Sequence, residues 1–207
     1  MPKSKSKRGK RYQPKPCGIP LGFRPQRLEQ IEAMFTNVET SVLLKLRAGE
    51  CSLDEMRAVR DVLNIALFSM THRQKGFKDW PLDEISEQII QAGADNARVI
   101  ERAKERGRVV CTGDEIESIC DTLQACVTFC QEQLKQCPGI FVVEVNAAKI
   151  LTHTHMGRVT VTKKNIDWVF DKAMEITHMR PDTQERLFAD LTERARHLPI
   201  GQIVPAM

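Results

Sequence analysis

The sequence is poor in aromatic residues, which make up 5% of its 207 residues and include a single tyrosine, Tyr12. A core with so few aromatic rings depends on Leu, Ile, Val, Ala, Met and Cys, and this composition favours helix-on-helix packing over a β-sandwich. No apolar run approaches the ~20 residues that span a bilayer, and the charged N-terminus lacks the apolar segment of a secretory signal peptide. We therefore expect a cytoplasmic protein without a membrane partner.

Local catalytic and cofactor motifs are also absent. The sequence contains no Gly-x-Ser-x-Gly, no phosphate-binding loop, no dinucleotide-binding glycine fingerprint and no His-Glu-x-x-His. We therefore predict a protein that is not an enzyme and that uses no cofactor. An enzyme whose catalytic residues are dispersed over several helices leaves no local motif, so that class stays open as a third alternative.

The seven cysteines include no Cys-x-x-Cys pair, the spacing typical of structural zinc sites. Their odd number, in a chain without a signal peptide, predicts reduced thiols. Four of them fall in one segment, namely Cys120, Cys126, Cys130 and Cys137. Cys126 and Cys130 lie one turn apart on the apolar stripe of a predicted helix, where a free cysteine behaves as a small hydrophobic residue. We interpret them as core residues and predict no metal site.

His153 and His155 form the one local histidine pair. In an extended segment both side chains would point to the same side, an arrangement that metal sites sometimes use. No flanking Asp, Glu or Cys completes a ligand set, so a polar turn is the preferred interpretation.

Acidic residues are missing from the first 27 positions, which hold nine basic side chains. Residues 28–207 have 22 basic and 27 acidic side chains and therefore a net charge of −5, although the whole chain has +4. We predict that residues 1–25, rich in Pro, Gly and basic residues, form a flexible basic arm. Such an arm can neutralise phosphates of DNA or RNA. The candidate nucleic-acid-binding residues are Lys3, Lys5, Lys7, Arg8, Lys10, Arg11 and Lys15.

Apolar residues recur beyond the arm at three- and four-residue spacing, which is typical of amphipathic helices. Capping boxes at Ser52–Glu55 and Thr112–Glu115 mark two helix starts. The predicted helices run from after Pro25 to Gly49, from Ser52 to near Gly76, from about Pro81 to Gly107, from Thr112 to Pro138, and over about 163–178 and 182–197.

The segment 140–162 is ambiguous. Phe141–Val145 and Val159–Thr162 have strand propensity and are compatible with a hairpin. Asn146–Leu151 instead continues naturally as a helix. We favour a helix over about 140–153, with a short extended segment at 158–161.

These patterns predict an all-α fold, an antiparallel bundle of about five to seven helices with a disordered basic N-terminal arm. We divide the chain into the arm (1–25), a helical bundle (26–150) and a C-terminal helical extension (151–207).

Several short motifs occur in a fixed order along residues 11–150. They are Arg11-Tyr12-x-Pro14-Lys15-Pro16 with Ile19-Pro20, then Leu63-Asn-Ile-Ala-Leu67, Ile90-Gln91-Ala92-Gly93, and Arg102 to Arg108 followed by Glu115-Ile116. In this order they resemble a group of uncharacterised small helical proteins encoded in prophages and integrative elements of proteobacteria. The resemblance implies a mobile-element origin and a helical fold, and it brings no catalytic residue.

Two further basic features are weaker candidates for nucleic-acid contact. Arg98, Arg102, Lys104, Arg106 and Arg108 end the third predicted helix, but interleaved Glu101 and Glu105 favour a solvated face. Lys163 and Lys164 precede Trp168, without the turn chemistry of a helix-turn-helix.

The leading hypothesis is a non-enzymatic accessory protein of a mobile element that acts by binding. In this hypothesis the arm contacts nucleic acid and the acidic body contacts protein. The alternative is a protein–protein adaptor or self-associating protein that binds no nucleic acid.

Overall fold

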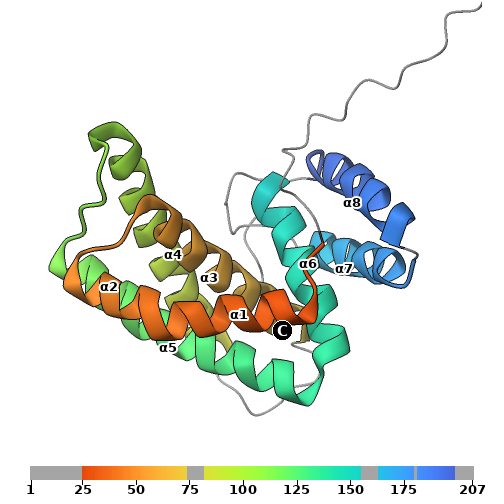
Figure 1. Cartoon of the computed structure of the whole chain (residues 1–207), viewed down its shortest axis with the longest axis horizontal. Coiled ribbons are helices and arrows are strands. Elements are labelled where there is room, and N and C mark those ends of the chain that lie inside the picture. Colours follow the sequence, from red (N-terminus) through yellow and green to blue (C-terminus); the bar gives the residue numbers. More distant parts are fainter. Residues whose placement is uncertain (1–24, 74–81, 155–162, 180, 199–207) are drawn as a thin grey trace, which may run out of the picture.

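The computed structural model describes residues 25–73, 82–154, 163–179 and 181–198, and within them every regular element is helical (Figure 1). This confirms the predicted all-α fold with five to seven helices, because the first three of the nine segments are continuous and form one helix. The segments are α1 (Leu28–Asn37), η1 (Val38–Val42), α2 (Leu43–Ala48), α3 (Leu53–Arg73), α4 (Leu82–Arg106), α5 (Gly113–Gln136), α6 (Pro138–Thr154), α7 (Lys163–Thr177) and α8 (Pro181–Ala195). The predicted arm, through residue 24, lies outside the described residues.

The first helix includes a π-helical segment, η1, that the sequence pattern did not predict. The predicted apolar stripe nevertheless faces the core along its length, since Ile31, Phe35, Val38 and Val42 are buried. Gly49 ends the helix in the left-handed conformation (φ 73°), which glycine adopts without steric penalty. The predicted end of this helix is therefore confirmed.

Both predicted capping boxes are formed. At the start of α3, Glu55 N–H donates to Ser52 Oγ (3.2 Å), and Ser52 N–H donates to Glu55 Oε2 (2.7 Å). At the start of α5, Glu115 N–H donates to Thr112 Oγ1 (3.3 Å), and Thr112 N–H donates to Glu115 Oε2 (2.9 Å). Each box satisfies backbone donors that the first turn of a helix leaves without partners.

The described part of the ambiguous segment, residues 140–154, is helical, as we favoured, and belongs to α6, which begins at Pro138 and runs to Thr154. The β-branched residues of α6 favour a strand locally, but burial of the segment against its neighbours favours the helix. Phe141, Val143, Val145, Ala147 and Ala148 are all buried, so α6 is covered on most of its circumference. The extended segment predicted at 158–161 lies outside the described residues.

The core is centred on α3, which packs against α4, α5, α6 and α7. Helices α4 and α5 are antiparallel, since Asp95 contacts Ser118 whereas Arg102, two turns later on α4, contacts Glu115. Across the core, the rings of Phe35 on α1 and Phe141 on α6 lie 6.0 Å apart between centroids, a spacing typical of interacting aromatic pairs.

Helices α7 and α8 pack against each other and against α6, on the side away from α4 and α5 (Figure 1). The predicted division at residue 150 falls inside α6, where Ile150 and Leu151 are both buried. No helix among the described residues has both the length and the apolar character needed to cross a bilayer.

Candidate functional site: the groove between helices α4 and α5

A groove of about 1050 Å³ follows the seam between the N-terminal half of α4 and most of the length of α5, from Glu117 to Gln136. Its apolar lining comes from three helices, with Met70 at the end of α3 joining the side chains of α4 and α5. The apolar residues that line it are Met70, Ile85, Ile89, Ala125, Cys126 and Phe129. We refer to this feature as the α4–α5 groove.

The polar residues of the α4–α5 groove are mostly acidic or amide side chains. Glu117, Asp121 and Glu132 line it and are exposed, whereas Arg47 is the one basic residue among the described residues of its lining. The amides come from five glutamines, Gln88, Gln91, Gln124, Gln133 and Gln136. The groove therefore combines an apolar floor with a negatively charged rim.

Cys126 belongs to the floor of the groove. Its side chain is 1% exposed, and burial raises the pKa of its thiol to about 12. Cys130, one turn further along α5, is fully buried. Within the described ranges, no group of three His, Cys, Asp or Glu side chains is arranged to hold a metal ion.

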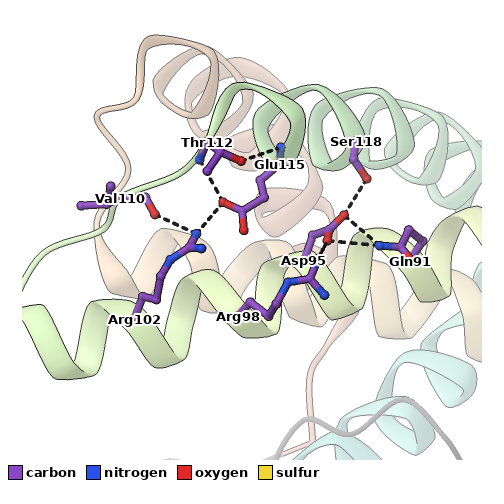
Figure 2. A network of polar contacts seen from close by, with 8 residues as sticks. All are labelled: Gln91, Asp95, Arg98, Arg102, Val110, Thr112, Glu115 and Ser118. Carbon is purple, nitrogen blue, oxygen red and sulfur yellow. Dashed lines mark hydrogen bonds and ion pairs between the residues drawn. The ribbon is translucent and has the colours of Figure 1, made fainter.

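A polar network ties α4 to α5 at one end of the groove (Figure 2). The buried carboxylate of Asp95 on α4 accepts a hydrogen bond from Ser118 Oγ on α5 (2.9 Å) and pairs with Arg98. Gln91 Nε2 donates to both oxygens of Asp95 (3.2 and 3.3 Å). Gln91 and Ser118 also line the groove. Because the buried carboxylate of Asp95 has donors from both helices, these contacts hold the two helices at a fixed separation where the groove ends.

A second set of polar contacts ties α4 to the loop between the two helices and to the start of α5. Arg102 on α4 pairs with Glu115 and donates to the carbonyl oxygen of Val110 (3.0 Å), as Figure 2 shows. The hydrogen bond from Arg102 is the main cause that lowers the pKa of Glu115, and the Thr112 backbone N–H adds to it. Glu115 therefore caps α5 and joins it to α4 as an anion.

The basic cluster predicted at the end of α4 is largely neutralised by its neighbours. Arg98 pairs with Asp95, Arg102 with Glu115, and Lys104 with Glu101. These contacts fit the interpretation of this cluster as a solvated face.

The remaining site predictions fall outside what the structure describes. The seven candidate residues of the arm, from Lys3 to Lys15, lie before residue 25, and His155 lies between α6 and α7. The side chains of His153, Lys163 and Lys164 are likewise outside the described part.

Sequence reasoning missed the α4–α5 groove and its polar network. Asp95 and Asn96 on the otherwise apolar stripe of α4 were a usable signal, since both are buried. Asn96 Nδ2 donates to the carbonyl oxygen of Met56 on α3 (3.2 Å). Polar residues in an apolar stripe indicate cross-helix hydrogen bonds because buried polar groups need partners.

Comparisons with protein-family models, with curated proteins and with solved structures find no match to this chain. What the chain itself defines is a class, an all-helical bundle that carries an apolar groove with an acidic rim.

Proposed function

We propose that this protein acts by binding, with its helical body receiving a basic amphipathic segment of a partner protein in the α4–α5 groove and its arm contacting nucleic acid. The observation that carries the proposal is the combination of an apolar floor and an acidic rim in the groove. Amphipathic helices bind in apolar grooves through side chains spaced three and four residues apart. Opposite charges around the contact then add orientation and a faster association rate.

The size of the groove supports a peptide-like partner. Small-molecule pockets commonly enclose about 300–1000 Å³, and the α4–α5 groove, at about 1050 Å³, lies just above that range. It is open along the helix seam and has several apolar side chains in its lining, from Ile85 to Phe129. It therefore suits several neighbouring apolar side chains of one segment.

The distribution of charge supports the second contact. The first 27 residues carry nine cations and no anion, whereas the remainder has a net charge of −5. Phosphate neutralisation by such a segment is largely independent of base sequence. The acidic remainder would be repelled by nucleic acid, so the contact is assigned to the arm. The resemblance over residues 11–150 suggests an accessory protein of a mobile element. That role is compatible with a protein that binds nucleic acid through its arm and a partner protein through its groove.

A model peptide tests the groove. An 18-residue amphipathic helix of Leu and Lys should bind the protein in fluorescence anisotropy, and a Leu and Glu peptide of the same pattern should not. Asp121→Lys should weaken binding of the Leu and Lys peptide, because it places a cation on the rim. Glu175→Lys is the matched control, since Glu175 is exposed on α7 away from the groove. Equal binding of both peptides, or equal effects of the two substitutions, would contradict the groove as the site.

A deletion tests the arm. Labelled duplex DNA, single-stranded DNA and RNA should bind the full chain at low salt, more weakly near physiological salt, and not at all to a chain lacking residues 1–24. Salt-insensitive binding, or binding that survives the deletion, would contradict the role of the arm.

One observation favours the alternative, a self-associating adaptor. Ile140 on α6 and Met179 after α7 are 48% and 41% exposed. Ile140 lines an apolar hollow of about 610 Å³ together with Leu28, Val142 and Met174. If this face joins two copies, sedimentation should show a dimer in high salt that Ile140→Glu dissociates. A monomer at all concentrations would rule this alternative out.

A further inference from the structure

A second cleft, of about 490 Å³, lies where the start of α1 meets α6 and α8. Its lining is mainly polar, in contrast to the α4–α5 groove. Its polar lining includes the side chains of Gln26, Arg27, Asn146, Lys149, Gln184 and Glu185. We call it the arm-root cleft, because the basic arm ends where the described chain begins, at Pro25, which also lines it.

The chain entering α1 is fixed at this cleft by a buried asparagine. Asn146 on α6 is 2% exposed, and its Oδ1 accepts a hydrogen bond from Gln26 N–H (2.7 Å). Its Nδ2 donates to the carbonyl oxygen of Gln26 (3.1 Å) and of Val142 (3.0 Å). The backbone at the root of the arm is therefore held on both sides, and the cleft has a firm wall.

Lys149, one turn after Asn146 on α6, is a half-buried lysine with no ion pair or hydrogen bond to the described residues. Burial lowers the pKa of its ammonium group, and the carboxylate of Asp61 acts in the opposite direction. An ammonium group has three donors and no acceptor, and withdrawing it from water without a partner is unfavourable. An anion entering the cleft would supply the missing acceptors.

Two other groups in the cleft also have unused hydrogen-bonding capacity. Arg27 is exposed, and its guanidinium pairs with no carboxylate among the described residues. The side-chain oxygen of Gln26 is buried without a partner, and rotating the amide by 180° would present its NH₂ group instead. Among the described residues that line the cleft, Glu185 is the one carboxylate, so their net charge is +1 on a body whose net charge is negative.

We infer that the arm-root cleft binds a phosphate group, held by Lys149 and Arg27 with the side-chain amides of Gln26 and Gln184 as further donors. Arginine and lysine are the usual phosphate partners, the first as a planar fork and the second as a point charge. The inference rests on the nucleic-acid part of the proposed function, since a phosphodiester bound along the arm would reach its root. Free phosphate offers the same oxygens, and the experiment separates the two sources.

The experiment uses the full chain labelled with ¹⁵N and two probes, inorganic phosphate and a 12-nucleotide single-stranded DNA. The side-chain amide signals of Asn146 and Gln184 report on the cleft, and anisotropy reports DNA affinity at several salt concentrations. Lys149→Gln should weaken DNA binding several-fold and reduce the slope of log affinity against log salt by about 0.7, the value of one phosphate contact on a single strand. Lys149→Arg should restore most of the affinity.

Lys135→Gln is the matched control, because Lys135 is exposed on α5 and the change of charge is the same. It should leave affinity within about twofold of wild type and the amide signals of the cleft unmoved. Circular dichroism and the thermal midpoint of each variant establish that it is folded.

Amide shifts with inorganic phosphate that Lys149→Gln abolishes would support the site and show that free phosphate suffices. Shifts with DNA alone, again abolished by Lys149→Gln, would support it with the nucleic-acid backbone as the source. Unmoved amide signals with both probes, or equal effects of Lys149→Gln and Lys135→Gln, would overturn the inference. If the wild type bound phosphate at the cleft but did not bind DNA, the phosphate site would be supported and the proposed nucleic-acid function would be contradicted.

Discussion

The carboxylate of Glu144 on α6, which is fully buried, accepts a hydrogen bond from the hydroxyl of Ser69 on α3 at 2.6 Å. Oε1 of the same carboxylate lies 3.1 Å from Nδ1 of His72. The His72 ring in turn stacks on Phe170 of α7, with 3.8 Å between the ring centroids. A buried carboxylate needs donors to offset its loss of hydration. This pair therefore joins α3 to α6 through a polar contact inside an otherwise apolar core.

Ser69→Ala should destabilise the protein by about 1–3 kcal/mol, because it leaves a buried carboxylate one donor short. Urea unfolding followed by circular dichroism measures the change. Thr40→Ala is the control, since Thr40 is exposed and its hydroxyl bonds only to the carbonyl of Thr36 in its own helix. Equal effects of the two substitutions would show that Glu144 is satisfied without Ser69.

Gly49→Ala should destabilise the protein by about 1–2 kcal/mol, the steric penalty of a left-handed conformation for a residue with a Cβ atom. No neighbouring atom lies near the position of that Cβ, so backbone conformation is the sole cause. Gly113→Ala is a matched control, because its surroundings are also open and its φ is not positive. It should be neutral or slightly stabilising. Thermal unfolding of both variants compares them, and an unchanged midpoint for Gly49→Ala would contradict the reasoning.

Gly49 and the two capping boxes illustrate which parts of the fold could be predicted from the sequence. Gly49 and the capping boxes at Ser52 and Thr112 act on residues within five positions, so their geometry is encoded locally and their predicted boundaries were confirmed. The strand-like composition of α6 was ambiguous because its outcome depends on burial by α3, α7 and α8, which local sequence does not contain. The α4–α5 groove was out of reach for the same reason, as Met70, Ile85 and Phe129 belong to three different helices.

The pH dependence of stability should reflect Glu55. Hydrogen bonds from Lys45 and from the Ser52 backbone N–H lower the pKa of Glu55 from 4.5 to about 2. A carboxyl whose folded pKa is below its unfolded pKa stabilises the protein fully above the unfolded value. That contribution is lost as the pH falls from 4.5 towards 2. Glu115, whose pKa is also lowered, acts in the same direction.

Glu55→Gln should therefore reduce stability near pH 7 and flatten its decline between pH 4.5 and 2. The amide can keep the capping box, which isolates the effect of charge. Urea unfolding at a series of pH values measures both changes. Glu105→Gln, at an exposed position on α4, should leave the profile unchanged, and a similar flattening by that control would contradict the assignment to Glu55.

Cys126 should resist alkylation as long as the protein is folded. Burial raises its thiol pKa to about 12, and the thiolate is the reactive form. Cys137, which is only half-buried at the end of α5, provides the internal comparison. After a pulse of iodoacetamide, mass spectrometry should find Cys137 modified first and Cys126 modified only as urea unfolds the chain. Equal rates in native buffer would show that the floor of the groove opens readily.

The hydrogen bonds between Asn146 and Gln26 determine where the arm can be removed, and removing it changes how the protein binds in ion-exchange chromatography. They make Gln26 part of the body, so the natural place to shorten the chain is just before Pro25. The shortened chain has 23 basic and 27 acidic side chains, so its net charge is −4 where the full chain has +4. Near neutral pH the full chain should bind a cation exchanger and the shortened chain an anion exchanger. Loss of the arm during purification would therefore separate the two forms into different pools.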